Sequence, residues 1–246
     1  MQFSIDDKFS FFGAQFKTMS TYVIGDVHGC LGALKALVAA TDIKPGDTLI
    51  FLGDYISRGT DSKGVIDWIL EHQSTYHIIA LRGNHEIMMR RARKGKRQFM
   101  QWYRFGGEST LKSYGITEYS NWREAVPKSH WKFLKSTRSY YVWRHFVFVH
   151  AGLENGVPMH EQSKAALFWR KYPKPEKYSE DAVVICGHTP RKDGRIADFG
   201  HAICLDTYAY GGKWLSCLHL PSGRFWQARE KGKTRKGILP GAMALQ

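Results

Sequence analysis

The sequence predicts an α/β fold, and three observations lead to this prediction. Up to about residue 180, short runs rich in apolar and β-branched residues alternate with segments of helical periodicity. Beyond that point, short apolar runs separated by turn residues indicate an antiparallel portion rich in hairpins. The chain has 246 residues, of which 43% are hydrophobic and 24% charged. This is enough for the core of one larger domain or, as the alternative, two small ones.

Five apolar runs are predicted to be strands. They are TYVIG at 21–25, TLIFLG at 48–53, HIIALRG at 77–83, HFVFVHAG at 145–152 and AVVICGH at 182–188. Helical spacing of apolar residues predicts helices over Leu31–Ala40, Lys63–His72 and Glu86–Arg93. The segment at 201–228, HAICLDTYAYGGKWLSCLHLPSGRFWQA, supplies the antiparallel portion.

We expect an N-terminal extension at 1–18, a main domain at 19–228 and a basic, disordered tail at 229–246. The first segment is rich in Phe, but its acidic residues and its lack of a small-residue cleavage site argue against a signal peptide. It is an upstream extension, a frayed tail or an arm that packs through its Phe side chains. The composition of KGKTRKG at 231–237 indicates disorder in the tail.

Cysteine usage and charge restrict the compartment and the partners. The four cysteines have no CxxC spacing, which predicts neither a disulfide framework nor a thiolate zinc site and favours a reducing cytoplasm. No apolar run is long enough to span a membrane. The formal net charge of +14 indicates a phosphorylated or polyanionic partner, with a merely basic soluble protein as the alternative. The basic run RRARKGKRQ at 90–98 is typical of nucleic-acid binders but equally of a solvated helix face, so nucleic acid is the less favoured partner. The oligomeric state is not predicted.

Side chains of metal-binding types follow the five predicted strands. Glycine precedes most of them, and the group consists of Asp26, His28, Asp54, Asn84, His150 and His188. Each alone is explained by a turn, a helix cap or a core hydrogen bond. Together they end the strands at the sheet edge where α/β proteins place their sites. Carboxylate, amide and imidazole donors without thiolate suit Mn²⁺, Fe²⁺ or Zn²⁺, and one shared carboxylate suits two ions.

Five ordered motifs carry a resemblance to a known family. They are GDVHG at 25–29, GDYISRG at 53–59, RGNHE at 82–86, HAG at 150–152 and GHTP at 187–190. This series resembles that of the phosphoprotein phosphatase family within the calcineurin-like metallophosphoesterases, and especially its bacterial and phage serine/threonine phosphatases. The similarity runs from about Tyr22 to Gln227. It implies that residues 19–228 form a metallophosphoesterase domain, a β-sandwich of two mixed sheets flanked by helices.

The resemblance also implies a dinuclear centre. Two divalent ions, Mn²⁺ with Fe or Zn as alternatives, would activate a water for direct in-line attack on phosphorus. The implied ligands are Asp26 and His28 for the first ion, Asn84, His150 and His188 for the second, and Asp54 as the bridge.

Three further residues receive roles through the same resemblance. Arg58 would hold phosphate oxygens through its planar fork, and so would Arg170, for which a surface arginine is the alternative. His85 would donate a proton to the leaving group as general acid.

Ser57 departs from the pattern, since most family members carry an acid there that orients the histidine. Asp206 is a candidate substitute, with a turn-forming role as the alternative. Symmetrical diadenosine tetraphosphate hydrolases also lack that acid, but they usually carry Asp where this chain has Glu86. The sequence therefore favours a phosphomonoesterase acting on phosphoserine or phosphothreonine in proteins. Such a hydrolase is the main alternative, and a basic nucleic-acid-binding module is a weaker one.

Overall fold

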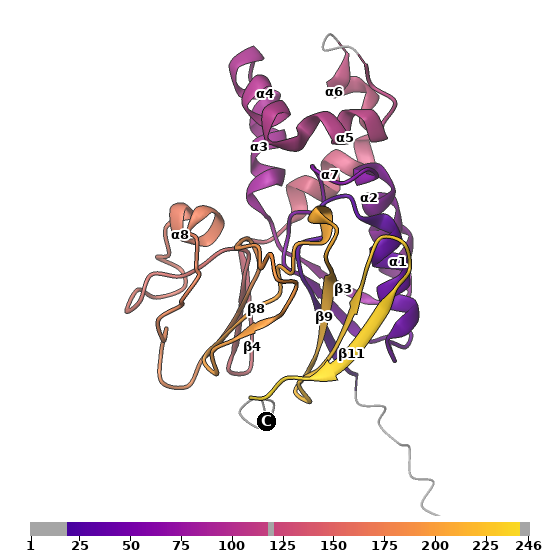
Figure 1. The fold of residues 1–246 in the computed structure, drawn as a ribbon. Coiled ribbons are helices and arrows are strands. Elements are labelled where there is room, and N and C mark those ends of the chain that lie inside the picture. Colours follow the sequence, from indigo (N-terminus) through magenta and orange to yellow (C-terminus); the bar gives the residue numbers. More distant parts are fainter. Residues whose placement is uncertain (1–18, 118–120, 242–246) are drawn as a thin grey trace, which may run out of the picture.

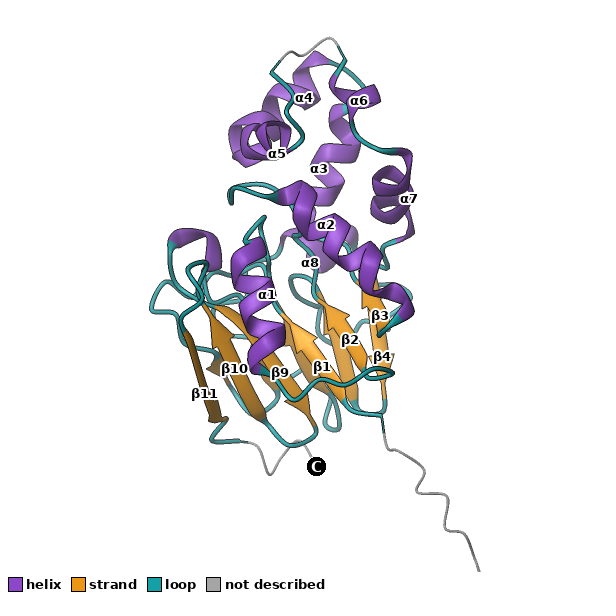
Figure 2. Cartoon of the chain, turned by 90° about the vertical axis from the view of Figure 1, so that its right-hand side faces the viewer, coloured by secondary structure: helices purple, strands orange, loops and turns teal. Residues whose placement is uncertain are grey.

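Two mixed β-sheets pack face to face, with helices outside them (Figures 1 and 2). This architecture confirms the predicted fold class. The computed structural model describes residues 19–117 and 121–241. The expected N-terminal extension at 1–18 lies outside the described residues.

The first sheet has the strand order β11-β10-β9-β1-β2-β3. Its parallel part consists of β1 (Thr21–Ile24), β2 (Thr48–Phe51) and β3 (His77–Ala80). Its antiparallel part consists of β9 (Leu215–Leu220), β10 (Arg224–Ala228) and β11 (Thr234–Ile238). The hairpin expected within 201–228 is therefore confirmed as β9 and β10.

The second sheet has the strand order β4-β5-β6-β8-β7. Its three central strands β5 (Phe146–Val149), β6 (Val183–Cys186) and β8 (Ala202–Cys204) are parallel. The edge strands β4 (Tyr140–Trp143) and β7 (Ala197–Asp198) are antiparallel to their neighbours. The segment at 202–204 thus pairs in parallel with β6 as well as antiparallel with β7, which the sequence did not indicate.

Alternating side chains of the central strands build two cores. In β1, Val23 joins the cluster between the sheets, whereas Tyr22 and Ile24 pack under the helices of the first sheet. Successive side chains of a strand point to opposite faces, so a strand covered on both faces is a continuous apolar run. Phe148 and Ile185 of the second sheet complete the central cluster.

The three predicted helices are confirmed within two residues. They are α1 (Leu31–Ala40), α2 (Ser62–Glu71), which a short 3₁₀ turn at His72–Ser74 extends, and α3 (Asn84–Ala92). Helix α3 begins two residues earlier than expected, because the Glu86 carboxylate accepts a hydrogen bond from the Gly83 N–H and closes the first turn.

A helical cap above the first sheet was not predicted (Figure 2). It contains α4 (Lys96–Trp102), a π turn at Tyr103–Gly107, α5 (Glu108–Ser113), α6 (Trp122–Ala125) and α7 (Lys128–Ser136). Its centre is aromatic: Trp102 and Trp122 are buried with ring centroids 5.3 Å apart, and Trp131 lies 5.8 Å from Trp122. Beside the second sheet, α8 (Lys164–Trp169) stands apart from this cap (Figure 1).

The prediction of a disordered tail is wrong for residues 229–241. β11 pairs along its whole length with β10. The Glu230 carboxylate accepts hydrogen bonds at 3.1 Å from the N–H groups of Gly32 and Ala33 in the first turn of α1, and Arg235 stacks on Trp214. These contacts with distant segments order a stretch whose own composition favours disorder. Residues 242–246 lie outside the described part of the chain.

Two compositional expectations also have structural outcomes. Cys30, Cys186, Cys204 and Cys217 are all free and buried. Across residues 19–117 and 121–241, no helix has the length and apolarity needed to cross a membrane.

Candidate functional site

The predicted ligand residues converge where the parallel strands of both sheets end. The first sheet contributes Asp26 after β1, Asp54 after β2 and Asn84 at the start of α3, and the second contributes His150 after β5 and His188 after β6. Two groups of side chains could each hold a metal ion: one of His28, Asp54 and His85, and one of Asp54, His150 and His188. Asp54 is common to both groups.

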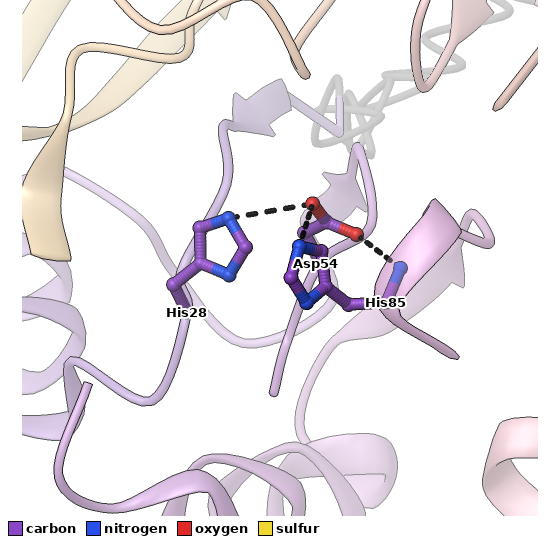
Figure 3. A group of neighbouring side chains, drawn as sticks. All are labelled: His28, Asp54 and His85. Carbon is purple, nitrogen blue, oxygen red and sulfur yellow. Dashed lines mark hydrogen bonds and ion pairs between the residues drawn. The ribbon is translucent and has the colours of Figure 1, made fainter. Parts of the chain in front are cut away.

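The Asp54 carboxylate lies at the centre of the site (Figure 3). Its Oδ2 is 3.3 Å from His28 Nε2 and 4.0 Å from His85 Nε2, and its Oδ1 is 3.6 Å from His150 Nε2. The same Oδ1 accepts a hydrogen bond from the His85 backbone N–H at 3.1 Å. One carboxylate therefore faces imidazoles from both sides.

Backbone carbonyls orient three of these imidazoles. Nδ1 of His28 lies 3.0 Å from the Ile56 carbonyl, and Nδ1 of His150 lies 2.9 Å from the Leu52 carbonyl. An N–H on that nitrogen donates to the carbonyl, which leaves the Nε2 lone pair directed at Asp54. His188 is turned the other way, with Nε2 3.2 Å from the Trp169 carbonyl.

An amide oxygen and a second carboxylate complete the donor set. Asn84 Oδ1 lies 3.0 Å from both His150 Nε2 and His188 Nδ1. Asp26 Oδ2 accepts from the His188 backbone N–H at 3.0 Å, whereas its buried Oδ1 has no partner in the described residues. Buried polar atoms are normally satisfied, so the free lone pairs of this oxygen fit the coordination of a cation. Inward lone pairs from carboxylate, amide and imidazole around one shared Asp fit two divalent cations.

Glycines and strained backbone make room for these carboxylates. A Cβ on Gly83 would lie 2.0 Å from Asp54 Oδ1, and one on Gly187 would lie 1.9 Å from Asp26 Oδ1. His28, Asp54 and His188 have left-handed φ angles of 46°, 51° and 61°. Such strain in residues other than glycine clusters at functional sites.

Burial shifts the ionisation of the site toward neutral forms. Desolvation raises the pKa of Asp54 to about 7, and it raises the pKa of Asp26 as well, with further contributions from the charges of Asp206 and Asp54. Desolvation lowers the pKa of His150 to about 4 and that of His188 to about 3. The imidazoles of His150 and His188 are therefore neutral at physiological pH, and the positive charge of Arg58 offsets only part of the effect of burial on Asp54.

Glu86 holds the site together through the backbone, a role that the sequence analysis missed. Its carboxylate accepts hydrogen bonds from the N–H groups of Asp54 and Tyr55 at 2.9 Å, besides that of Gly83 at 2.7 Å. It fixes the end of β2 against the start of α3. Glu86 therefore has a structural role in holding β2 against α3. This role weakens its use in the sequence analysis as the residue that separates protein phosphatases from diadenosine tetraphosphate hydrolases.

The two predicted phosphate-binding arginines are placed differently. Arg58 lies in the site, with Nη1 3.2 Å from His28 Nε2 and its guanidinium 4.4 Å above the ring of Tyr210. Arg170 is exposed after α8 and donates to the Leu153 carbonyl at 2.9 Å. Tyr210, which sequence reasoning missed, also lies edge-on to His28 at 4.8 Å. The two tyrosines of the segment TYAYGG at 207–212 are the sequence signal that could have indicated Tyr210.

Among the residues that the structure describes, no carboxylate accepts a hydrogen bond from His85 Nδ1. This buried nitrogen has no hydrogen-bond partner among the described residues, and the buried Oγ of Ser57 has none either. Asp206 accepts from the Tyr208 N–H at 3.2 Å and raises the pKa of Asp26, but makes no hydrogen bond to His85. The contact with the Tyr208 N–H agrees with the turn-forming alternative for Asp206, and no hydrogen bond between described residues supports its role as a substitute acid.

Comparison with known proteins settles the family. The model of the calcineurin-like phosphoesterases matches residues 19–216. The chain belongs to this family. Members of the calcineurin-like phosphoesterases use divalent metal ions, in agreement with the donor set above.

Individual relatives of this calcineurin-like phosphoesterase are similar either over about a quarter of the chain or, as solved structures, over most of it at less than 20% identity. A symmetrical bis(5'-nucleosyl)-tetraphosphatase of Pectobacterium atrosepticum is 44% identical over 70 residues, covering 28% of this chain and 24% of the relative. The chain thus spans about a quarter of the length of that curated relative. A solved candidate diadenosine tetraphosphatase has a TM-score of 0.63 at 19% identity, covering 91% of this chain and 95% of its own. A cold-active protein-tyrosine phosphatase of a psychrophilic Shewanella has a TM-score of 0.61 at 14% identity, covering 89% and 80%. At these identities, the two structures show the shared fold.

Proposed function

We propose that this protein is a phosphoester hydrolase that depends on two divalent metal ions, with Mn²⁺ favoured and Fe or Zn as alternatives. One observation carries the proposal: Asp54 is shared by two adjacent groups of buried donors. Asp26, whose buried Oδ1 is free to coordinate, and His28 would hold one ion beside Asp54, and Asn84, His150 and His188 would hold the other. When bound, the two ions supply Lewis-acid polarisation of the phosphoryl group and a water nucleophile at neutral pH.

The chain's own residues hold the phosphate and move the proton. Arg58 offers its guanidinium fork to phosphate oxygens, and the ring of Tyr210 supports that fork at 4.4 Å. His85 lies 4.0 Å from Asp54 and serves as general acid for the departing alkoxide. Arg170 would be a second phosphate ligand through the guanidinium N–H groups that do not donate to the Leu153 carbonyl.

We propose phosphoserine or phosphothreonine in proteins as the substrate. Symmetrical cleavage of dinucleoside tetraphosphates is the second candidate. Two symmetrical bis(5'-nucleosyl)-tetraphosphatases, each 44% identical to this chain over 70 residues, support this candidate. The serine at position 57, where an acid would favour the phosphatases, supports it as well.

A substrate panel tests both candidates. Purified protein loaded with Mn²⁺ is assayed on phosphoserine peptides, nitrophenyl phosphate and diadenosine tetraphosphate. We expect the highest kcat/KM on the phosphopeptides. A higher value on the dinucleotide would replace the first candidate by the second, and active protein free of divalent metal would refute the proposal as a whole.

A further inference from the structure

A cationic groove, here called the α3 groove, runs past the C-terminal end of α3. It consists of two cavities of about 350 and 680 Å³ that share Arg90, Arg93 and Lys94. The smaller cavity reaches Phe168 and Trp169 of α8, and the larger one extends to α6 and α7. Figure 1 shows α8 on one side of α3 and α6 on the other.

Positive charge in the α3 groove is not compensated within the described chain. The cations include Arg91 on α3, Lys164 on α8, Arg123 on α6 and Lys128 on α7, whereas Glu124 is the one acidic residue in the lining. None of the cations of the groove forms an ion pair in the described residues. A row of like charges beside a cavity favours an anionic ligand.

Helix α3 links the α3 groove to the candidate active site. Helix α3 carries Asn84 and His85 at its start and the groove cations at its end. At 1.5 Å per residue, Arg93 lies roughly 14 Å along the helix from Asn84. An extended peptide covers that distance with about four residues. Trp169 of α8 provides a second link, because its carbonyl lies 3.2 Å from His188 Nε2 and its side chain lines the smaller cavity.

We propose that the α3 groove binds acidic residues of a polypeptide substrate, beginning about four residues from the phosphorylated side chain. This inference rests on the phosphoprotein phosphatase function proposed above. The planar guanidinium of arginine forms paired hydrogen bonds with a carboxylate. Two adjacent cavities lined by cations can bind several carboxylates of one extended peptide. Single-stranded nucleic acid fits less well, because base stacking needs free aromatic faces. The face of Trp131 is already covered by Arg93 at 4.7 Å, which leaves Trp169 as the exposed ring in the groove.

The test compares two peptides with one central phosphoserine and eight flanking residues on each side. The outer four residues on each side are Asp and Glu in one peptide and Ala and Gln in the other, and the inner four are Ala and Gln in both. Their unphosphorylated versions give affinity by fluorescence anisotropy without turnover. The groove variant is Arg91→Gln/Arg93→Gln/Lys94→Gln. The matched control is Lys35→Gln/Lys44→Gln/Lys231→Gln, which removes the same charge from exposed positions on and near α1 and in the β10–β11 turn. Thermal melting verifies that both variants fold.

We expect the acidic peptide to bind wild type at least about tenfold more tightly than the neutral one at low salt. The groove variant should lose this preference, in affinity and in KM, and the control should keep it. Equal affinities for wild type, or equal losses in both variants, would overturn the proposal. A ten-nucleotide oligothymidylate serves as the nucleic-acid probe. If it binds wild type more tightly than the acidic peptide does, and the groove variant loses this binding, the ligand of the groove is nucleic acid and not a polypeptide. Preferential binding without hydrolysis of either phosphopeptide would refute the phosphatase function and leave the groove assignment standing.

Discussion

His85 is the residue whose role can be separated most sharply from its neighbours. If its imidazole protonates the departing oxygen, His85→Asn should slow hydrolysis of phosphoserine peptides by about a hundredfold or more. Nitrophenyl phosphate, whose leaving group needs little protonation, should lose much less. Steady-state rates of the metal-loaded variant on both substrates provide the measurement. Equal losses would indicate that His85 holds a metal ion, as its place beside Asp54 and His28 also permits.

At the scale of single elements, α1 depends on a residue near the other end of the chain. Its N-cap residue Cys30 provides no side-chain cap, and the Glu230 carboxylate binds the N–H groups of Gly32 and Ala33 instead. Glu230→Ala should lower the free energy of unfolding by about 1 kcal/mol, because it removes a cap and a favourable charge at the helix N-terminus. Urea unfolding measures this loss. Glu161→Ala, at an exposed surface pair with His160, should leave stability nearly unchanged.

Helices α2 and α7 are joined by a partly buried hydrogen-bond chain. The Tyr114 hydroxyl lies 2.8 Å from His130 Nδ1, and His130 Nε2 lies 2.9 Å from the carboxylate of Asp67, which Lys63 also contacts. Burial lowers the pKa of His130. Burial opposes ionisation of Asp67, but the hydrogen bonds that its carboxylate accepts from Lys63 and from the neutral His130 ring bring its pKa below the usual range.

The sign of the resulting pH dependence follows from proton uptake. Below about pH 6.5 the unfolded chain protonates His130 and the folded chain does not, so folding loses stability as the pH falls. His130→Gln should cost about 1–3 kcal/mol at pH 7.5, because the Tyr114 and Asp67 partners become poorly satisfied. The difference from wild type should shrink toward pH 5.5 in urea titrations. The exposed His160→Gln should show neither effect, and a constant difference across this range would contradict the assignment.

For the molecule as a whole, features encoded in short contiguous segments could be predicted and those made by distant contacts could not. Buried strands such as β1 and β6 are continuous apolar runs, and a Gly-Asp or Gly-His pair at their ends is conspicuous. The helical cap escaped prediction because its core joins Trp102 to Trp122 across twenty residues of sequence. β11 escaped because its composition is polar, while the residue that anchors its turn binds α1 from 198 positions away. The same limit applies to Glu86, two of whose three backbone partners lie more than thirty positions upstream.

The candidate metal site joins the two sheets, so metal binding should stabilise the entire fold. Asp26, Asp54 and Asn84 follow strands of the first sheet, and His150 and His188 follow strands of the second. A ligand that binds only the folded state adds about 2.7 kcal/mol at a free concentration one hundred times its Kd. Mn²⁺ should therefore raise the melting temperature of chelator-treated protein by several degrees, and should restore the activity that chelation removes. Asp54→Asn should abolish both effects, since it withdraws the donor shared by the two groups. The control Lys35→Gln, at an exposed position on α1, should keep both the rise in melting temperature and the restored activity. A melting temperature that is indifferent to Mn²⁺ in wild type would mean that the converging side chains are a polar core and not a metal centre.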